Sequence, residues 1–230
     1  LSVPIVLLFL GFVVFAFFFI FVEKRVAEPL VHLGIFADRG FLFTICATVT
    51  ALMILSGIGF LMPFYLELVK GMTADKVGLF ILVFTGIFAI VSSAFAGKLS
   101  DRIMPAKICA VAVFSVALAS LFFSCIVGAP GYAYVIIFFV WMGASLGFFM
   151  PSNNNQVMRK ATSATKGELS GLLNTSVNLS FTLGICIFET IYSLNTNILH
   201  GCRNAVIFGA IACGAAMVLS LASIKAKTVR

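Results

Sequence analysis

The stretch from residue 41 to residue 66, FLFTICATVTALMILSGIGFLMPFYL, contains no charged side chain in 26 positions. As an α-helix it is about 39 Å long, which exceeds the roughly 30 Å of a bilayer's hydrocarbon core. A strand of a membrane β-barrel would instead alternate apolar and polar residues over about ten positions. The stretch therefore predicts a transmembrane helix.

Six further uncharged runs share these properties. Together the seven runs occupy residues 3–22, 41–66, 77–97, 108–127, 132–150, 169–188 and 205–224. The whole chain is 62% hydrophobic and only 10% charged, whereas soluble domains carry about 25% charged residues. These features exclude a soluble globular domain and predict an all-α integral membrane protein with seven transmembrane helices in the lipid bilayer.

The fifteen Lys and Arg residues lie singly and in pairs between the apolar runs. This scatter does not favour nucleic-acid binding, although the formal net charge is +7. Twelve of the fifteen lie in segments 23–40, 98–107, 151–168 and 225–230, which alternate onto one side of the membrane, and three lie on the other side. This bias predicts a multi-pass protein of the plasma membrane with a cytoplasmic C-terminus.

Groups for catalysis or metal binding are sparse. His32 and His200 lie in connections on opposite sides of the membrane, and no Cys or His pair has metal-ligand spacing. The Cys residues are interpreted as small apolar residues, and only Cys202 is expected in a polar connection. We expect no enzyme activity, no cofactor and no metal site.

The number of spans indicates how the chain is organised. Six helices form one half of a two-fold-repeated transporter, in which the transport site lies between the halves. Seven spans therefore indicate a second half with one additional helix in front of it. Because Leu1 is not an initiator methionine, we expect the chain to begin within a longer protein, and its partner to be an N-terminal half or a second copy.

The connection at 97–107 reads GKLSDRIMPAK. Physical reasoning predicts a tight hairpin, in which Gly97 permits close helix approach and Asp101 accepts bonds from N–H groups at the start of the next helix. The spacing G-x-L-x-D-R also resembles the loop signature of the major facilitator superfamily, in its weaker second-half copy. The resemblance implies a loop gate at Gly97, Asp101 and Arg102; the alternative is a turn that only sets orientation.

Two further stretches resemble the fourteen-span drug:proton antiporter family within that superfamily. They lie at 23–41 and at 65–79, and the resemblance covers essentially the whole chain. It implies that residues 1–22 form an additional central transmembrane helix, 23–40 a cytoplasmic linker, and 41–230 the C-terminal six-helix bundle. The chain departs from the family pattern at Glu67, where Gln is common, and near Val83, where a proline is usual.

The run at 169–188 and its flanks carry a stripe of mostly polar residues at intervals of three or four. Its members are Ser170, Asn174, Asn178, Thr182, Ile185 and Glu189. This spacing places them within about 120° of one helix face, which should not face lipid. Asn174, Asn178, Thr182 and Glu189 are therefore candidates for a substrate or proton pathway, with Glu189 as a proton carrier. The alternatives are interhelical hydrogen bonds and, for Glu189, a position at the outer interface.

Two other features have structural interpretations. Gly143 and Gly147 have the G-x-x-x-G spacing that permits close helix packing, and Gly209 and Gly214 form a similar small-residue face. The polar run PSNNNQ at 151–156 is expected to be a solvated helix end, with an inner vestibule as the alternative.

Together these observations predict the C-terminal half of a multidrug-type efflux transporter. The resemblance implies export of small hydrophobic or cationic compounds coupled to protons. Many Phe and Met and few charges in the spans favour bulky apolar substrates. A sugar or amino-acid permease of the same fold and a non-transporting half-length membrane partner are the alternatives.

Overall fold

A computed structural model describes residues 38–159, 161 and 165–228, with side chains up to residue 221, together with scattered positions between 10 and 25. The chain divides into two units, Leu1–Ala37 and Asp38–Arg230. In the first unit an apolar helix covers Val13–Val22. Most of the rest of the predicted first span, and nearly all of the predicted linker 23–40, lie outside the described residues.

In the second unit, the described residues form six helices long and apolar enough to cross a membrane. The elements are α2 (Arg39–Leu68), α3 (Ala74–Ile81), the π-helical turn η2 (Leu82–Gly86), α4 (Ile87–Arg102), α5 (Pro105–Ile126), α6 (Ala133–Met158), α7 (Lys166–Ser193) and α8 (Ile198–Thr228). The α3, η2 and α4 elements together make one of the six spans. The predicted all-α membrane fold is therefore confirmed for the six spans after the first.

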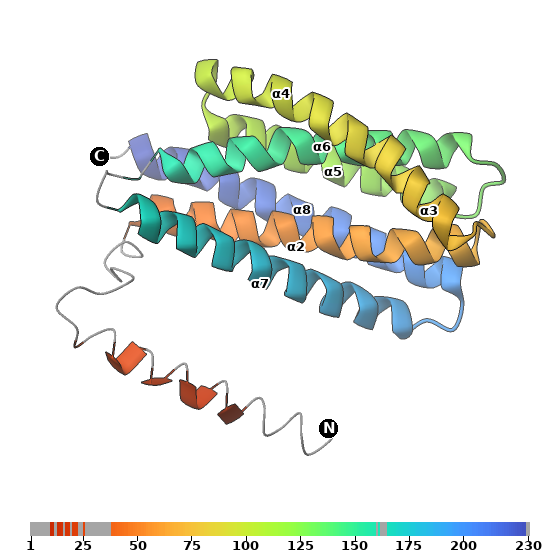
Figure 1. Cartoon of the computed structure of the whole chain (residues 1–230), viewed down its shortest axis with the longest axis horizontal. Helices are drawn as coiled ribbons and strands as arrows, with labels where there is room; N and C mark the ends of the chain where they lie inside the picture. The colour runs from red at the N-terminus through yellow and green to blue at the C-terminus, as the bar shows by residue number, and fades with distance from the viewer. Residues whose placement is uncertain are drawn as a thin grey trace. The chain divides into compact units, whose positions relative to one another are not determined.

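The helices pack against one another in the spatial order α7, α2, α8, α5, α6, α4. Figure 1 shows α4 along one edge of the bundle and α7 along the opposite edge, with the other helices between them. Helices α2 and α6 touch each other only weakly, and so do α6 and α7. This arrangement leaves a gap in the packing between α2 and α6.

The core contains large aromatic side chains that join α2, α5 and α6. Tyr65 and Phe123 are fully buried, and their ring centroids lie 5.0 Å apart in an edge-to-face contact. Phe123 also contacts the ring of Phe138, with centroids 4.5 Å apart. The Tyr65 hydroxyl donates a hydrogen bond to the Val127 carbonyl at 3.0 Å, so its polar end is satisfied inside the core.

Glycines allow α4 and α6 to approach closely. A Cβ atom added at Gly143 would lie 2.9 Å from the Thr85 Cα, and one added at Gly147 would collide with Ser92 and with the backbone of α4. The packing interpretation of this glycine pair is confirmed. At the second predicted pair, Gly209 packs against Phe188 and Ile54, whereas a Cβ at Gly214 would meet nothing within 4 Å.

Two predicted helix ends were placed too far inside the apolar runs. Helix α8 begins at Ile198 rather than at residue 205, so Cys202 is a fully buried helical residue and not part of a polar connection. Helix α6 continues to Met158 through the polar run at 151–156. In α6, Asn153 is buried against α2, whereas His200, Arg203 and Asn204 at the start of α8 are exposed.

Candidate functional site

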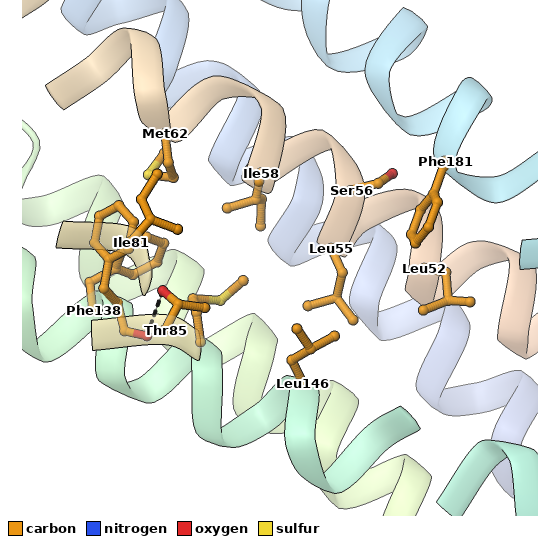
Figure 2. A pocket seen from close by; sticks show the side chains of 13 residues that line it. Leu52, Leu55, Ser56, Ile58, Met62, Ile81, Thr85, Phe138, Leu146 and Phe181 are labelled. Atoms are coloured by element: carbon orange, nitrogen blue, oxygen red, sulfur yellow. Dashed lines mark hydrogen bonds between the residues drawn. The ribbon is translucent and has the colours of Figure 1, made fainter. Parts of the chain in front are cut away.

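A cavity of about 190 Å³ lies in the gap between α2 and α6. It is lined by Leu52, Leu55, Ser56, Ile58, Gly59, Met62, Ile81, Thr85, Phe138, Phe139, Met142, Leu146 and Phe181. In Figure 2 the side chains of Leu55 and Leu146 point toward each other across the cavity from opposite helices. The floor residues, such as Ile58 and Phe138, are buried, whereas Gly59 and Phe181 are exposed. The cavity therefore opens at the surface of the bundle.

The lining of this cavity is almost entirely apolar, and its two hydroxyl groups already have partners. Ser56 donates to the Met53 carbonyl at 3.0 Å, and Thr85 donates to the Phe139 carbonyl at 3.4 Å, the bond drawn in Figure 2. No lining residue carries a formal charge. Such a surface suits a bulky apolar ligand better than a strongly polar one.

The π-helical turn at Leu82–Gly86 lies beside the cavity and separates α3 from α4. It contains Val83, near which the fourteen-span family usually has a proline. A π-turn interrupts the regular i to i−4 hydrogen bonds much as a proline does, and such turns are frequent at functional sites. Thr85, from this turn, and Ile81, which precedes it, both line the cavity.

The polar stripe of α7 is exposed along its whole length. Asn174, Asn178, Thr182 and Glu189 all have exposed side chains, while the opposite face of the helix is buried. None of the four lines the cavity; the α7 residue that does so is Phe181. Within the described part of the chain, the side chains of Asn174 and Asn178 make no interhelical hydrogen bond.

The hairpin between α4 and α5 differs from its prediction in two respects. Asp101 lies in the last turn of α4, and the N-cap of α5 is Met104, which makes no side-chain capping bond. The prediction that Asp101 caps the next helix is therefore wrong, because Pro105 at the first position needs no N–H partner and its fixed φ already suits a helix. A Cβ added at Gly97 would meet nothing within 4 Å, so close approach at Gly97 is not found in the described bundle either.

Arg159 of α6 contacts this hairpin instead. Its guanidinium Nη2 donates to the Ser100 carbonyl at 2.7 Å, at the C-terminal end of α4. Asn155 donates to the Ser100 hydroxyl at 3.0 Å. Arg102, the third residue of the predicted gate, is exposed. The end of α4 is thus held by α6.

The polar run at 151–156 also joins α6 to α2, so its interpretation as a solvated helix end is wrong. Asn153 is 5% exposed, and the Thr48 hydroxyl donates to its side-chain oxygen at 2.7 Å. Gln156 donates to the Thr44 hydroxyl at 3.2 Å. These bonds account for Asn153 and Gln156, since a buried amide must find a partner. The polar contacts of α6 thus reach Thr44 and Thr48 on α2 and Ser100 on α4.

The remaining chemistry-bearing groups form no site. No group of three His, Cys, Asp or Glu side chains that could hold a metal is found among the described residues. All six cysteines, each within the described range, are free thiols.

Comparison with known proteins places the chain in a family. Residues 2–185 match the family model described as the Major Facilitator Superfamily. The riboflavin transporter RibZ of Clostridioides difficile (strain 630) is 27% identical over 172 residues, which are 74% of this chain and 37% of that protein. Multidrug resistance protein 3 of Bacillus subtilis (strain 168) is 24% identical over 198 residues, 83% of this chain and 37% of that protein.

A third relative has a name that specifies one exported compound. The tetracenomycin C resistance and export protein of Streptomyces glaucescens is 28% identical over 167 residues, 72% of this chain and 30% of that protein. The chain spans about a third of the length of these curated relatives. The family match covers most of the chain, and the six membrane-spanning helices agree with it. The chain is a multi-pass membrane protein that belongs to the Major Facilitator Superfamily.

Proposed function

We propose that the chain is the C-terminal part of a multidrug-type exporter, which moves hydrophobic or cationic compounds outward in exchange for protons. The apolar, uncharged cavity between α2 and α6 carries this proposal, because it offers a bulky apolar molecule contact area and no fixed polar partner. Two of the relatives have names that specify drug resistance, and one of these also specifies export. The proposal includes no enzymatic step.

The exposed face of α7 supports a second element of the proposal, an opposing bundle. Amide and carboxyl side chains are costly in hydrocarbon, so Asn174, Asn178 and Glu189 need protein or water as neighbours. The described six-helix bundle leaves all three side chains exposed. We propose that an N-terminal half, or a second copy of the bundle, lies against α7 and closes the cavity from the other side.

The mechanism proposed is a rocking motion of the two bundles around the cavity. Asn174, Asn178 and Thr182 would then contact substrate or line its path, and Glu189 would carry the proton. The charge bias of twelve basic residues to three supports a plasma-membrane protein with its C-terminus in the cytoplasm. The hairpin of Gly97, Asp101 and Arg102 would act as a gate on the cytoplasmic side.

Transport of a metabolite is the second candidate function. One relative is named as a riboflavin transporter, and its identity to this chain is similar to that of the two resistance proteins. The two functions differ in their substrates, and each can be offered to the same reconstituted protein.

The test is transport by the complete gene product in vesicles with an imposed proton gradient, with a lipophilic cationic dye and riboflavin as alternative substrates. We expect gradient-dependent dye movement. Leu146→Trp, which fills the cavity, should lower it about tenfold, equivalent to roughly 1.4 kcal/mol. Leu118→Trp on α5 is the matched control, because Leu118 is exposed and does not line the cavity. Movement of riboflavin but not dye would overturn the exporter proposal.

A further inference from the structure

A second hollow lies on a different part of the bundle, between α4 and α5. Its volume is about 570 Å³, within the roughly 300–1,000 Å³ of small-molecule sites. Helices α4 and α5 barely touch each other, and both pack on α6, which forms the floor. Exposed residues on its edge, such as Val111 at 67% and Ile103 at 42%, show that it opens outward. We call this hollow the α4–α5 groove.

The polar groups in the floor of the α4–α5 groove already satisfy one another. The Trp141 indole Nε1 donates to the Ser115 hydroxyl at 2.7 Å. The Ser145 hydroxyl lies 2.9 Å from the Ser115 hydroxyl and 2.9 Å from the Trp141 carbonyl. With these partners in place, the remaining lining other than Lys107, such as Leu99 and Phe148, is apolar. The deep part of the groove therefore favours a hydrocarbon chain over a polar ligand.

One end of the α4–α5 groove is cationic. Lys107, in the first turn of α5, lines the groove and is exposed. Among the described residues, it forms no ion pair with a carboxylate. Ser115 lies two turns further along α5, about 12 Å from Lys107 along the helix. The groove thus presents a cation at the helix end and an apolar channel toward the middle of the membrane.

We propose that the α4–α5 groove binds an anionic phospholipid, with one acyl chain over Trp141 and the headgroup phosphate at Lys107. The charge at one end and the apolar depth together match an anionic amphiphile whose chain runs along the helices. Basic pockets between transmembrane helices attract anionic headgroups, whereas a hydrophobic cation of the kind proposed for export would be repelled by Lys107. The site is separate from the transport cavity and independent of the proposed export.

Trp141 is the only tryptophan in the chain and lines the groove, so its fluorescence reports what enters. The 230-residue chain is reconstituted in mixed vesicles of phosphatidylglycerol and phosphatidylcholine, with bromine on the acyl chains of one lipid at a time. Bromine quenches an indole only at close contact. We expect brominated phosphatidylglycerol to quench Trp141 with about fivefold preference over brominated phosphatidylcholine.

Three variants separate the contribution of the Lys107 charge from that of the apolar groove. Lys107→Gln should reduce the preference to about one, while Lys98→Gln keeps it, because Lys98 lies in the same basic segment but does not line the groove. Ala144→Leu, which fills the groove, should weaken quenching by both lipids. Circular dichroism checks that each variant retains its helices.

Three outcomes would overturn the proposal. The first is equal quenching of the wild-type chain by the two lipids. The second is a preference that survives Lys107→Gln, or quenching that Ala144→Leu leaves unchanged. The third is stronger quenching by a brominated cationic amphiphile than by the anionic lipid, which would make the groove a site for cations.

Discussion

Helices α4 and α7 occupy equivalent places at the two edges of the bundle, yet they expose different side chains. Among the exposed residues of α4 are Ile90 at 70% and Phe95 at 63%, which lipid can cover. Helix α7 exposes Asn174, Asn178 and Glu189, which lipid covers only at a high cost. Exposure alone does not distinguish the two helices, whereas the polar chemistry of the exposed α7 face is what supports the proposed partner bundle there.

The two edges of the bundle also share one feature: each packs closely against its inner neighbour, α6 or α2, at glycine residues. On one edge, η2 packs on α6 at Gly143 and α4 packs on α6 at Gly147. On the other, α7 packs on α2 at Gly184, where a Cβ would collide with Ser56 and the Met53 carbonyl. Small residues allow backbones to approach and gain dispersion contacts, which replace the hydrophobic effect inside a membrane. Both edges therefore depend on close packing at glycines, and α4 is held in addition by the bonds of Arg159 and Asn155 to Ser100.

The largest change in the free energy of unfolding is expected at Gly147, where α4 and α6 approach most closely. Gly147→Ala should destabilise the bundle by about 1–3 kcal/mol, because the added methyl group must push Ser92 and the α4 backbone away. The matched control is Gly214→Ala in α8, where a Cβ meets nothing and the change should be neutral or stabilising by up to about 1 kcal/mol. Denaturation in detergent measures both. Equal stabilities for the two variants would contradict the glycine contact.

The next largest effect is expected on the transport rate, from a substitution in the exposed polar stripe of α7. Asn178→Leu should lower transport by about tenfold and leave stability nearly unchanged, because the side chain is exposed and makes no bond within the described bundle. Leu179→Ile is the control on the same turn, also exposed but apolar in both forms. If Asn178→Leu transports at the wild-type rate, the stripe has no part in the substrate path.

A third prediction distinguishes a role of Glu189 in proton coupling from a role in substrate binding. Glu189→Gln should remove the pH dependence of exchange while substrate binding persists, because an amide of the same shape cannot exchange a proton. Glu189→Asp should retain part of the dependence. The measurement is the transport rate of the complete protein between pH 6 and pH 8. An unchanged pH profile in Glu189→Gln would identify the residue as an interfacial anchor.

The fold could be predicted from the sequence because a membrane helix must form all of its backbone hydrogen bonds internally and must be apolar along its length. The helix ends were less predictable. The polar residues at 151–156 continue α6 because Thr48 and Ser100 on other helices bond to them. A sequence reveals the amides but not the partners, which lie about a hundred and about fifty residues away.

The cavity could not be predicted for a different reason. In a membrane protein both the core and the lipid-facing surface are apolar, so periodicity does not separate them. Leu55, which lines the cavity, and Phe95, which is exposed, both lie within uncharged apolar runs of the sequence. The stripe on α7 was visible because its residues are polar, and only Phe181, between Asn178 and Thr182, connects that helix with the cavity.

The smallest expected effect concerns two connections, one before α3 and one after α7. Lys70, just before α3, donates to the Ala129 carbonyl at 2.7 Å and to the Gly131 carbonyl at 3.1 Å in the turn before α6. The connection after α7 is held by a neutral pair, in which Asn204 donates to Asn195 at 2.9 Å. Lys70→Met should destabilise the bundle by about 1 kcal/mol and Asn204→Ala by about half as much, because bonds from a charged donor are the stronger.

The pH dependence of stability distinguishes the Lys70 bonds further. Burial lowers the pKa of Lys70 from its ordinary value of 10.5, so the folded state holds this proton less tightly than the unfolded state does. The protonated lysine therefore costs stability below its folded pKa, and the cost disappears as the pH rises from there toward 10.5. Wild-type stability should rise slightly over that window relative to Lys70→Met, as thermal unfolding at a series of pH values would measure. Parallel curves for the two proteins would mean that Lys70 is as well solvated in the folded bundle as in the unfolded chain.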